Sequence, residues 1–319
     1  MRNISCNLCG ENNTKLKYKI GKYHLVECQN CGLVYLNPQP DENEIAKEYE
    51  DQKIVFSGGE EKILDDYLAN KQKYWKDYKK RLAAIEKVFG VSKGKILDIG
   101  CAGGFFLDYL KYSGWQTYGV ELSKWGAETC QKKLGLNVFN GNLNQANFKD
   151  NFFDVITMYD VLEHTQEPAK ELIEVKRILK KDGLLIINVP NIDSFVSKLN
   201  KEKWNKLIPG QHLYFFTPQT LKKMLSKYNF TTISLKTLTG ETKETGLQIL
   251  GSPLGLASPS DSSKAVNFYR KHRKWLSWIK KVVKTVINIF SLIFIPFINW
   301  ILIKFGKGEG INILARNNE

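Results

Sequence analysis

Four cysteines near the start of the chain have the spacing of a metal site. Two residues separate Cys6 from Cys9 and Cys28 from Cys31, and 18 residues lie between the two pairs. Thiolates at this spacing bind Zn²⁺ tetrahedrally, and four of them leave no open position on the ion. Such binding contributes on the order of 10–16 kcal/mol to a segment too short to fold by packing alone. We therefore predict a zinc ribbon over residues 1–40, with a structural ion.

A second group of residues suits a nucleotide-like cofactor. An apolar strand predicted at 95–99 runs into a turn of small residues at 100–104, and a helical pattern follows. Glycine lets the backbone approach a ligand closely, and the start of the next helix directs N–H groups toward it. The strand predicted at 116–121 ends in Glu121, whose carboxylate can hold ribose hydroxyls. This succession of a strand, a glycine turn, a helix and a second strand that ends in an acidic residue predicts one mononucleotide half-site.

The same turn lacks the patterns of two other nucleotide-binding classes. Dinucleotide enzymes carry G-x-G-x-x-G, and Gly100, Gly103 and Gly104 are not in that register. No G-x-x-x-x-G-K-[ST] phosphate loop occurs in the sequence. The ligand is thereby narrowed to one that needs neither motif.

Apolar periodicity along the chain supplies the elements that must position these residues. Further strands are predicted at 136–139, 152–158, 184–189, 231–235 and 310–316, with amphipathic helices at 60–89, 123–134 and 168–179 and another after Pro218. Strands that alternate with helices indicate an α/β fold with a largely parallel sheet. We expect seven strands with helices on both faces, a small ribbon at the N-terminus and a helical apolar insertion before the last strand.

Two distant stretches resemble class I S-adenosylmethionine-dependent methyltransferases. Residues 97–104 read LDIGCAGG, where the family wording is close to LDIGCGxG and Ala102 replaces the middle glycine. Residues 153–164, FDVITMYDVLEH, and 175–191, VKRILKKDGLLIINVPN, match the family again and in the expected order. The N-terminal cysteines followed by GLVYLNPQP resemble the start of many bacterial methyltransferases that are found together with sugar and surface-polysaccharide enzymes. The fold implied is the Rossmann-like methyltransferase sheet.

The resemblance also implies which residues contact S-adenosylmethionine. The turn would face the methionine portion, Glu121 the ribose, and the loop after the third strand the adenine. Related enzymes commonly carry an acid where this chain has Asn142, whose side-chain oxygen can accept the same hydrogen bond. The implied cofactor-binding residues are Asp98, Gly100, Cys101, Gly104, Glu121, Asn142 and Leu143.

Two histidines are the candidate catalytic residues. His164 and His212 lie in loops that follow predicted strands, where ligands bind in an open α/β fold, and either could act as a general base. The alternative is that each ring makes only a loop or helix-cap hydrogen bond. These loops resemble those of zinc-ribbon sugar C-methyltransferases, but Gln211 stands where that group has a glutamate, which argues against ketosugar C-methylation. Glu163 is expected to fix a loop or helix terminus.

The segment between the ribbon and the first sheet strand is predicted to be helical. We divide the chain into the ribbon (1–40), a helical lid or linker (41–90) and the methyltransferase domain (91–319). The aromatic residues of the linker either cover the sheet or, as the resemblance suggests, include a lid over the cofactor between Tyr49 and Tyr78.

The late part of the domain is basic and apolar. The chain carries a formal charge of +14, and no acidic residue occurs between Ser262 and Lys284. A strongly apolar stretch follows at 282–305 within the insertion at 239–309. We expect residues 264–305 to lie on an acidic membrane face, or alternatively to form a protein-buried helical cap or homodimer contact.

Together these patterns predict a cytoplasmic enzyme, peripheral to the inner face of the membrane if the basic segment binds lipid. No apolar run follows Arg2, so we expect no secretory signal. The predicted reaction is methyl transfer to a small-molecule acceptor, such as a sugar or a lipid-linked intermediate of surface polysaccharide or secondary metabolism. Alternatives are an RNA methyltransferase, although no aromatic-basic strand suited to base stacking is present, and a non-catalytic membrane-docking scaffold.

Overall fold

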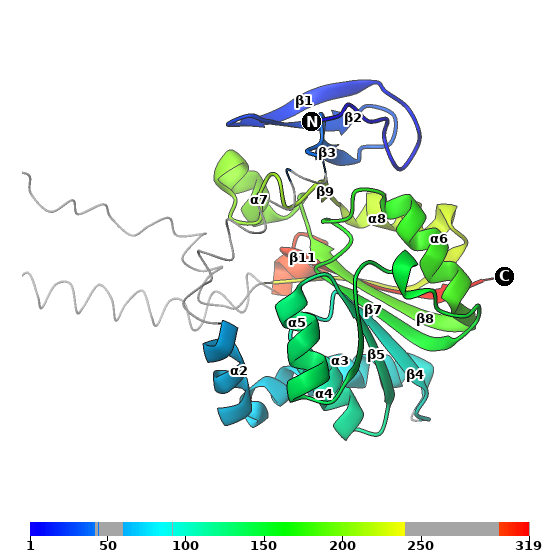
Figure 1. Cartoon of the computed structure of the whole chain (residues 1–319). Helices are drawn as coiled ribbons and strands as arrows, with labels where there is room; N and C mark the ends of the chain where they lie inside the picture. The colour runs from blue at the N-terminus through cyan, green and yellow to red at the C-terminus, as the bar shows by residue number, and fades with distance from the viewer. Residues whose placement is uncertain (42–43, 45–59, 91, 240–299, 319) are drawn as a thin grey trace, which may run out of the picture.

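A twisted seven-stranded sheet forms the centre of the molecule in the computed structural model, which describes residues 1–41, 44, 60–90, 92–239 and 300–318 (Figure 1). The strand order is β10-β11-β8-β7-β4-β5-β6. The strands from β6 to β8 are parallel, and β11 is antiparallel to both of its neighbours. The predicted α/β fold class is thus confirmed. The strands are β4 (Lys95–Ile99), β5 (Gln116–Glu121), β6 (Asn137–Asn140), β7 (Phe153–Tyr159), β8 (Leu179–Pro190), β10 (Phe230–Leu238) and β11 (Gly310–Asn317).

Alternation along the central strands sends side chains to two separate apolar layers. In β4, Ile96 belongs to one layer and Leu97 to the other, and Val155 and Ile156 of β7 divide in the same way. Successive strand residues point to opposite faces, so a strand that is apolar throughout needs cover on both sides. One face is covered by α3 (Lys71–Phe89), α4 (Phe105–Tyr112) and α5 (Lys124–Glu128), the other by α6 (Pro168–Ile178) and α8 (Pro218–Lys227).

A second, smaller sheet joins the N-terminal segment to the rest of the molecule. Its order is β1-β2-β3-β9, all antiparallel, with Val34 paired to Phe215 and Tyr35 to Tyr214. The first three strands lie within the predicted ribbon, but the fourth comes from the methyltransferase part of the chain. The ribbon therefore shares a sheet with the larger domain. Its strands are β1 (Thr14–Ile20), β2 (Tyr23–Cys28), β3 (Val34–Leu36) and β9 (Tyr214–Phe215).

The helical region before β4 consists of two helices. The helical pattern at 60–89 is compatible with one long helix or with one break, and the structure has the break, at Asn70, giving α2 (Glu60–Ala69) and α3. Tyr67 of α2 stacks on Phe105 at the start of α4, with ring centroids 4.0 Å apart, and its hydroxyl donates to Asp108 Oδ2 at 2.6 Å. This helix thus packs against the one that follows the glycine turn. Residues 49–59 of the expected lid lie outside the described residues.

Two element boundaries differ from the sequence-based expectation. The helix predicted at 123–134 leaves α-geometry after Glu128 and continues as one π-helical turn, η1 (Thr129–Lys133). Strand β8 begins at Leu179, whereas the strand was predicted from residue 184. Short helical segments complete the chain: η2 (Asn144–Ala146), α7 (Phe195–Asn200) and η3 (Lys201–Lys203).

Most of the predicted basic and apolar insertion, residues 240–299, lies outside the described residues. Its last turn of helix, at 300–304, leads into β11. Among the helices in the described part of the chain, none combines the length and the apolar character needed to cross a membrane.

Candidate active site

The turn after β4 is built from residues in the left-handed backbone region. Gly100 has φ 69° and Gly104 has φ 75°, a conformation that costs glycine nothing. Ala102 lies in the same region with φ 48°. The N–H groups of Gly100 and Cys101 donate to the carbonyl of Val120, at 2.8 and 3.3 Å. These two donors are used inside the fold and hold the turn against the end of β5.

Close packing requires the turn to lack side chains. A Cβ at Gly100 would lie 2.5 Å from Val161 Cγ2, and one at Gly104 would lie 2.5 Å from Cys130 Sγ. Val161 belongs to the loop that follows β7. The glycine turn and this loop therefore touch where β4 meets β7, the switch point at which open α/β sheets bind ligands.

Glu121 occupies the end of β5 as predicted and holds the turn in place. Its Oε2 accepts the N–H of Ala102 at 2.8 Å, and its Oε1 accepts the N–H of Ser123 at 2.7 Å. Glu121 is half-buried and Ala102 is exposed. Each carboxylate oxygen can accept more than one hydrogen bond, so the arrangement keeps capacity for ribose hydroxyls.

Asp98 lies one layer deeper, 5% exposed, and accepts the Thr157 hydroxyl at 2.6 Å. Burial raises the pKa of its carboxyl to about 6, against the opposing effects of the Thr157 hydrogen bond and of the Arg81 charge. This hydrogen bond ties the end of β4, directly before the glycine turn, to β7.

The predicted adenine residues have local structural partners. Asn142 Oδ1 accepts the N–H of Gln145 at 3.0 Å, while Gln145 Oε1 accepts the N–H of Asn142 at 3.0 Å. These two bonds resemble a capping box at the start of η2. Leu143 is buried in the core, so at this position a ligand could use only backbone atoms.

The two candidate histidines are brought together by the tertiary fold. The rings of His164 and His212 lie 4.6 Å apart between centroids and are nearly perpendicular. The Nδ1 of His164 lies 3.0 Å from the carbonyl oxygen of Gln211, and that of His212 lies 2.8 Å from that of Lys206. Both rings thus make hydrogen bonds to loop carbonyls, as expected if the two histidines have a structural role. The pair also follows β7 and precedes β9, beside the switch point.

Burial makes both imidazoles weak bases. The pKa of His164 is lowered by desolvation, and that of His212 is lowered to about 3 by desolvation and by the neighbouring His164. General bases are most effective with a pKa near the working pH. The environment therefore favours two neutral rings.

Glu163 differs from the expectation that its side chain fixes a loop. The side chain is 1% exposed, and in the described part of the chain neither carboxylate oxygen has a hydrogen-bond partner. Its backbone carbonyl instead accepts the N–H groups of Leu213 and Tyr214, at 2.8 and 3.1 Å. The main chain of Glu163 thus joins the β7 loop to β9. Burial raises the pKa of the carboxyl well above its ordinary value, and Asp160 adds to this.

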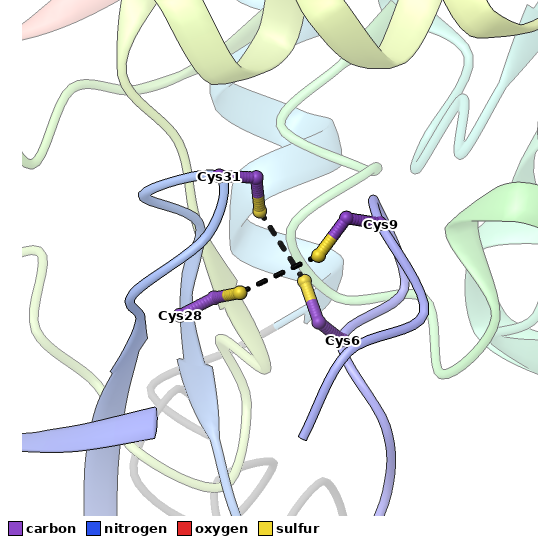
Figure 2. Close-up of side chains that lie close together, drawn as sticks. All are labelled: Cys6, Cys9, Cys28 and Cys31. Carbon is purple, nitrogen blue, oxygen red and sulfur yellow. Dashed lines mark hydrogen bonds between the residues drawn. The ribbon is translucent and has the colours of Figure 1, made fainter. Parts of the chain in front are cut away.

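The four N-terminal cysteines converge, as Figure 2 shows. The Sγ atoms of Cys6 and Cys31 are 3.4 Å apart, as are those of Cys9 and Cys28, and all four thiols are free of disulfides. A tetrahedral ion with Zn–S bonds of about 2.3 Å holds its sulfurs about 3.8 Å apart. The donor set and its spacing therefore fit a zinc ion.

The cysteine segment is attached to the larger domain by polar contacts as well as by the shared sheet. Lys227 of α8 donates to the carbonyl of Leu8 at 2.7 Å, and the N–H of Ala169 in α6 donates to Asn7 Oδ1 at 3.0 Å. These contacts hold the ribbon against the helices that flank the histidine pair.

Arg81 is a further residue of the site that belongs to no motif in the sequence. This α3 residue lies with its guanidinium centre 4.2 Å from the ring centroid of Tyr159, at the end of β7. The positive charge of Arg81 would attract an anionic group of a ligand bound at this edge of the sheet. The helical pattern places Arg81 on the same face as Tyr78, but only the packing of α3 reveals what that face meets.

Three features together define a class I S-adenosylmethionine-dependent methyltransferase: the strand order, the glycine turn after β4, and Glu121 at the end of β5. A family model described as "Methyltransferase domain" matches residues 67–235, more than half of the chain, so the chain belongs to that family. S-adenosylmethionine is the cofactor of this fold. The residues present fit it, because a half-buried carboxylate borders the exposed backbone of the glycine turn.

Individual relatives match the chain in part. An uncharacterized protein of Methanocaldococcus jannaschii is 29% identical over 175 residues, 54% of this chain and 82% of the relative. The ubiquinone biosynthesis O-methyltransferase of Glaesserella parasuis is 29% identical over 167 residues, 47% of this chain and 71% of that enzyme. A solved SAM-dependent methyltransferase from Archaeoglobus fulgidus has 21% identity and a TM-score of 0.48, covering 78% of this chain and 99% of that chain.

Proposed function

We propose that the chain transfers a methyl group from S-adenosylmethionine to a hydroxyl of a small-molecule acceptor. The observation that carries this proposal is the contact between the Gly100 turn and Val161, which brings the cofactor side of the site against the histidine loop. A methyl donor and its acceptor must meet in line, and holding two reactants in such a geometry is worth about 7–11 kcal/mol.

The chain's own residues divide between the two sides of the site. Glu121 binds the ribose hydroxyls, the Gly100 and Gly104 backbone allows the methionine portion to approach, and Asp98 keeps the turn in register. His164 and His212 form the acceptor side. The cofactor supplies a methyl group that is already activated on a sulfonium, so the protein has to position the acceptor and assist the loss of its proton.

Three observations support an oxygen acceptor of the sugar or lipid-linked class. Relatives of this chain are named ubiquinone biosynthesis O-methyltransferases. Gln211, beside the histidine pair, carries no carboxylate to abstract a proton from carbon. The N-terminal segment resembles that of bacterial methyltransferases found with sugar and surface-polysaccharide enzymes, which favours a sugar or a lipid-linked precursor.

We also propose that Cys6, Cys9, Cys28 and Cys31 bind a structural zinc ion. Support comes from the convergence of the four sulfurs and from their complete tetrahedral donor set. The purified chain should contain zinc that Cys9→Ser removes and Cys130→Ser retains, as measured by elemental analysis. Equal zinc in both variants would contradict the assignment.

Calorimetric titration with S-adenosylmethionine and its demethylated product tests the cofactor site. Glu121→Ala should weaken binding at least about tenfold, because a carboxylate hydrogen bond of roughly 1.5–3 kcal/mol is lost. Glu128→Ala, at the end of α5 with its side chain 43% exposed, is the matched control and should bind like the parent. Thermal melting must accompany the titration, since Glu121 also holds the turn.

His164→Ala should bind the cofactor normally and fail to methylate hydroxyl acceptors that the parent accepts. If the parent protein binds neither S-adenosylmethionine nor its demethylated product, the assignment of the chain as an enzyme is wrong. If His164→Ala methylates at the parent's rate, the histidine loop is not the acceptor side.

A further inference from the structure

Three potential metal ligands converge beside the cofactor turn. Glu163 and His164 follow β7, His212 precedes β9, and one donor atom from each lies within 4.8 Å of the others. A tetrahedral ion with bonds of about 2.0–2.1 Å separates such atoms by about 3.3 Å. The three donors would therefore have to approach one another by up to about 1.5 Å to bind one ion.

The carboxylate of this cluster is buried without compensation. Glu163 is 1% exposed and neither of its oxygens has a hydrogen-bond partner among the described residues. A buried ionised carboxylate is costly unless it is paired or binds a metal. The two charged side chains that act on it most, Asp160 and Lys206, oppose each other, and Lys206 makes no ion pair with it within the described part of the chain. A cation at the cluster would satisfy this carboxylate.

Both histidines are held in the tautomer that binds metals. A backbone carbonyl can only accept a hydrogen bond, so the Nδ1 atoms that face Gln211 and Lys206 must carry hydrogen. In a neutral ring the lone pair is then on Nε2. Metal-binding histidines characteristically donate their other N–H to a carbonyl or carboxylate, which fixes the orientation of the ring.

We propose that Glu163, His164 and His212 bind a divalent transition-metal cation, separate from the ion at the four cysteines. Two imidazoles and one carboxylate suit Zn²⁺ and the other first-row divalent ions better than Mg²⁺ or Ca²⁺, which prefer oxygen. Three protein ligands also leave coordination positions open, unlike the closed set of four thiolates.

An ion here would contact the acceptor, and this role rests on the proposed function. Val161, two residues before Glu163, packs on the Gly100 turn, so an ion at the cluster would lie near that turn. A hydroxyl bound to the cation becomes more acidic. This explains how acceptor oxygen could be activated beside two weakly basic imidazoles. Metal binding itself does not depend on the identity of the acceptor.

The test uses Co²⁺ as a probe on full-length protein that has been dialysed against a chelator and still holds its cysteine-bound zinc. Co²⁺ should add about one equivalent per chain, with the weak visible bands of nitrogen and oxygen ligands and no thiolate charge-transfer band. Glu163→Gln and His212→Ala should weaken this binding by at least about 100-fold, since loss of even an outer partner costs about 10–100-fold. Glu167→Gln, an exposed carboxylate four residues away, should bind Co²⁺ like the parent.

Absence of this one Co²⁺ equivalent in the parent would overturn the proposal, as would equal affinity in Glu163→Gln. Thermal melting provides a second measurement, because Co²⁺ should raise the melting temperature of the parent and not that of Glu163→Gln. Titration of S-adenosylmethionine on the same samples separates the two proposals. Cofactor binding without Co²⁺ binding rejects only the metal site, whereas Co²⁺ binding without cofactor binding rejects only the methyl-transfer function.

Discussion

Ala102 carries backbone strain at the centre of the cofactor turn. Its φ of 48° lies in the left-handed region, which costs a side-chain-bearing residue roughly 1–2 kcal/mol. Ala102→Gly should therefore raise the free energy of unfolding by about 0.5–1 kcal/mol, after allowance for the larger chain entropy of glycine. Urea denaturation measures this change. Ala83→Gly, on the exposed face of α3, should instead lower the same quantity by about 1 kcal/mol; a loss of stability in both variants would rule out strain at residue 102.

Asp98 should make stability depend on pH. Its pKa rises from an ordinary value of 3.8 to about 6 in the folded chain. Between these values the folded protein holds a proton that the unfolded chain releases, so the free energy of unfolding falls as pH increases. Asp98→Asn keeps an acceptor for Thr157 and should match the parent near pH 4 but exceed it by up to about 3 kcal/mol at pH 7.

The measurement for this prediction is urea denaturation across the same pH range, with exposed Asp182→Asn as control. A constant difference between Asp98→Asn and the parent from pH 4 to 7 would show that this carboxyl does not titrate there. Since Glu121 and Arg81 are the charged groups that act on Asp98, both must be intact in the comparison.

At the scale of elements, α2 is joined to the helix of the cofactor turn. Tyr67 is fully buried, and its hydroxyl donates to Asp108 at 2.6 Å while Lys71 pairs with the same carboxylate at 2.7 Å. Tyr67→Phe keeps the stacking on Phe105 and removes a hydrogen bond to a charged group, so the free energy of unfolding should fall by about 1.5–3 kcal/mol.

Chemical denaturation checks this loss, and Tyr74→Phe serves as control because its hydroxyl bonds only an exposed carboxylate, that of Asp66. Equal effects of the two substitutions would mean that the α2–α4 contact contributes little. Faster amide exchange at the start of α4 in Tyr67→Phe alone would place the effect at the cofactor turn.

Strand β9 makes a second connection between separate parts of the fold, in addition to the contact between α2 and α4. Its two residues extend the ribbon sheet, and the N–H groups of Leu213 and Tyr214 bond to the carbonyl of Glu163. One short strand thus connects the cysteine segment to both candidate histidines. A metal ion at the cysteines would in this way also stabilise the loops that carry His164 and His212, about 130 and 180 residues later in the chain.

On the scale of the whole molecule, the ribbon and the methyltransferase domain should unfold together. One apolar cluster runs from Cys6 and Leu8 through β3 to Leu221 and Leu225 of α8. Shared burial of this kind makes unfolding cooperative. If the cysteines bind Co²⁺, the thiolate–cobalt absorption and far-UV circular dichroism should give coincident transitions in urea. Loss of the absorption at a lower urea concentration would define the ribbon as a separate folding unit.

The amino-acid sequence by itself determined the elements and the local chemistry. Strands and helices follow from apolar periodicity, and the cysteine pairs and the glycine turn are recognisable because their members are close in sequence. Glu121 was predictable for the same reason, since one helix and one strand separate it from the turn. These features depend on interactions between near neighbours along the chain.

Tertiary structure decided the features that depend on distant segments. The contact of His164 with His212, the uncompensated carboxylate of Glu163 and the position of Arg81 all arise where loops and helices from separate regions pack together. The sharing of β9 between two parts of the chain is also of this kind. Periodicity records which face of an element is apolar, but the partner of that face is set by long-range packing. For this reason the candidate metal ligands became apparent as a group only in the folded molecule.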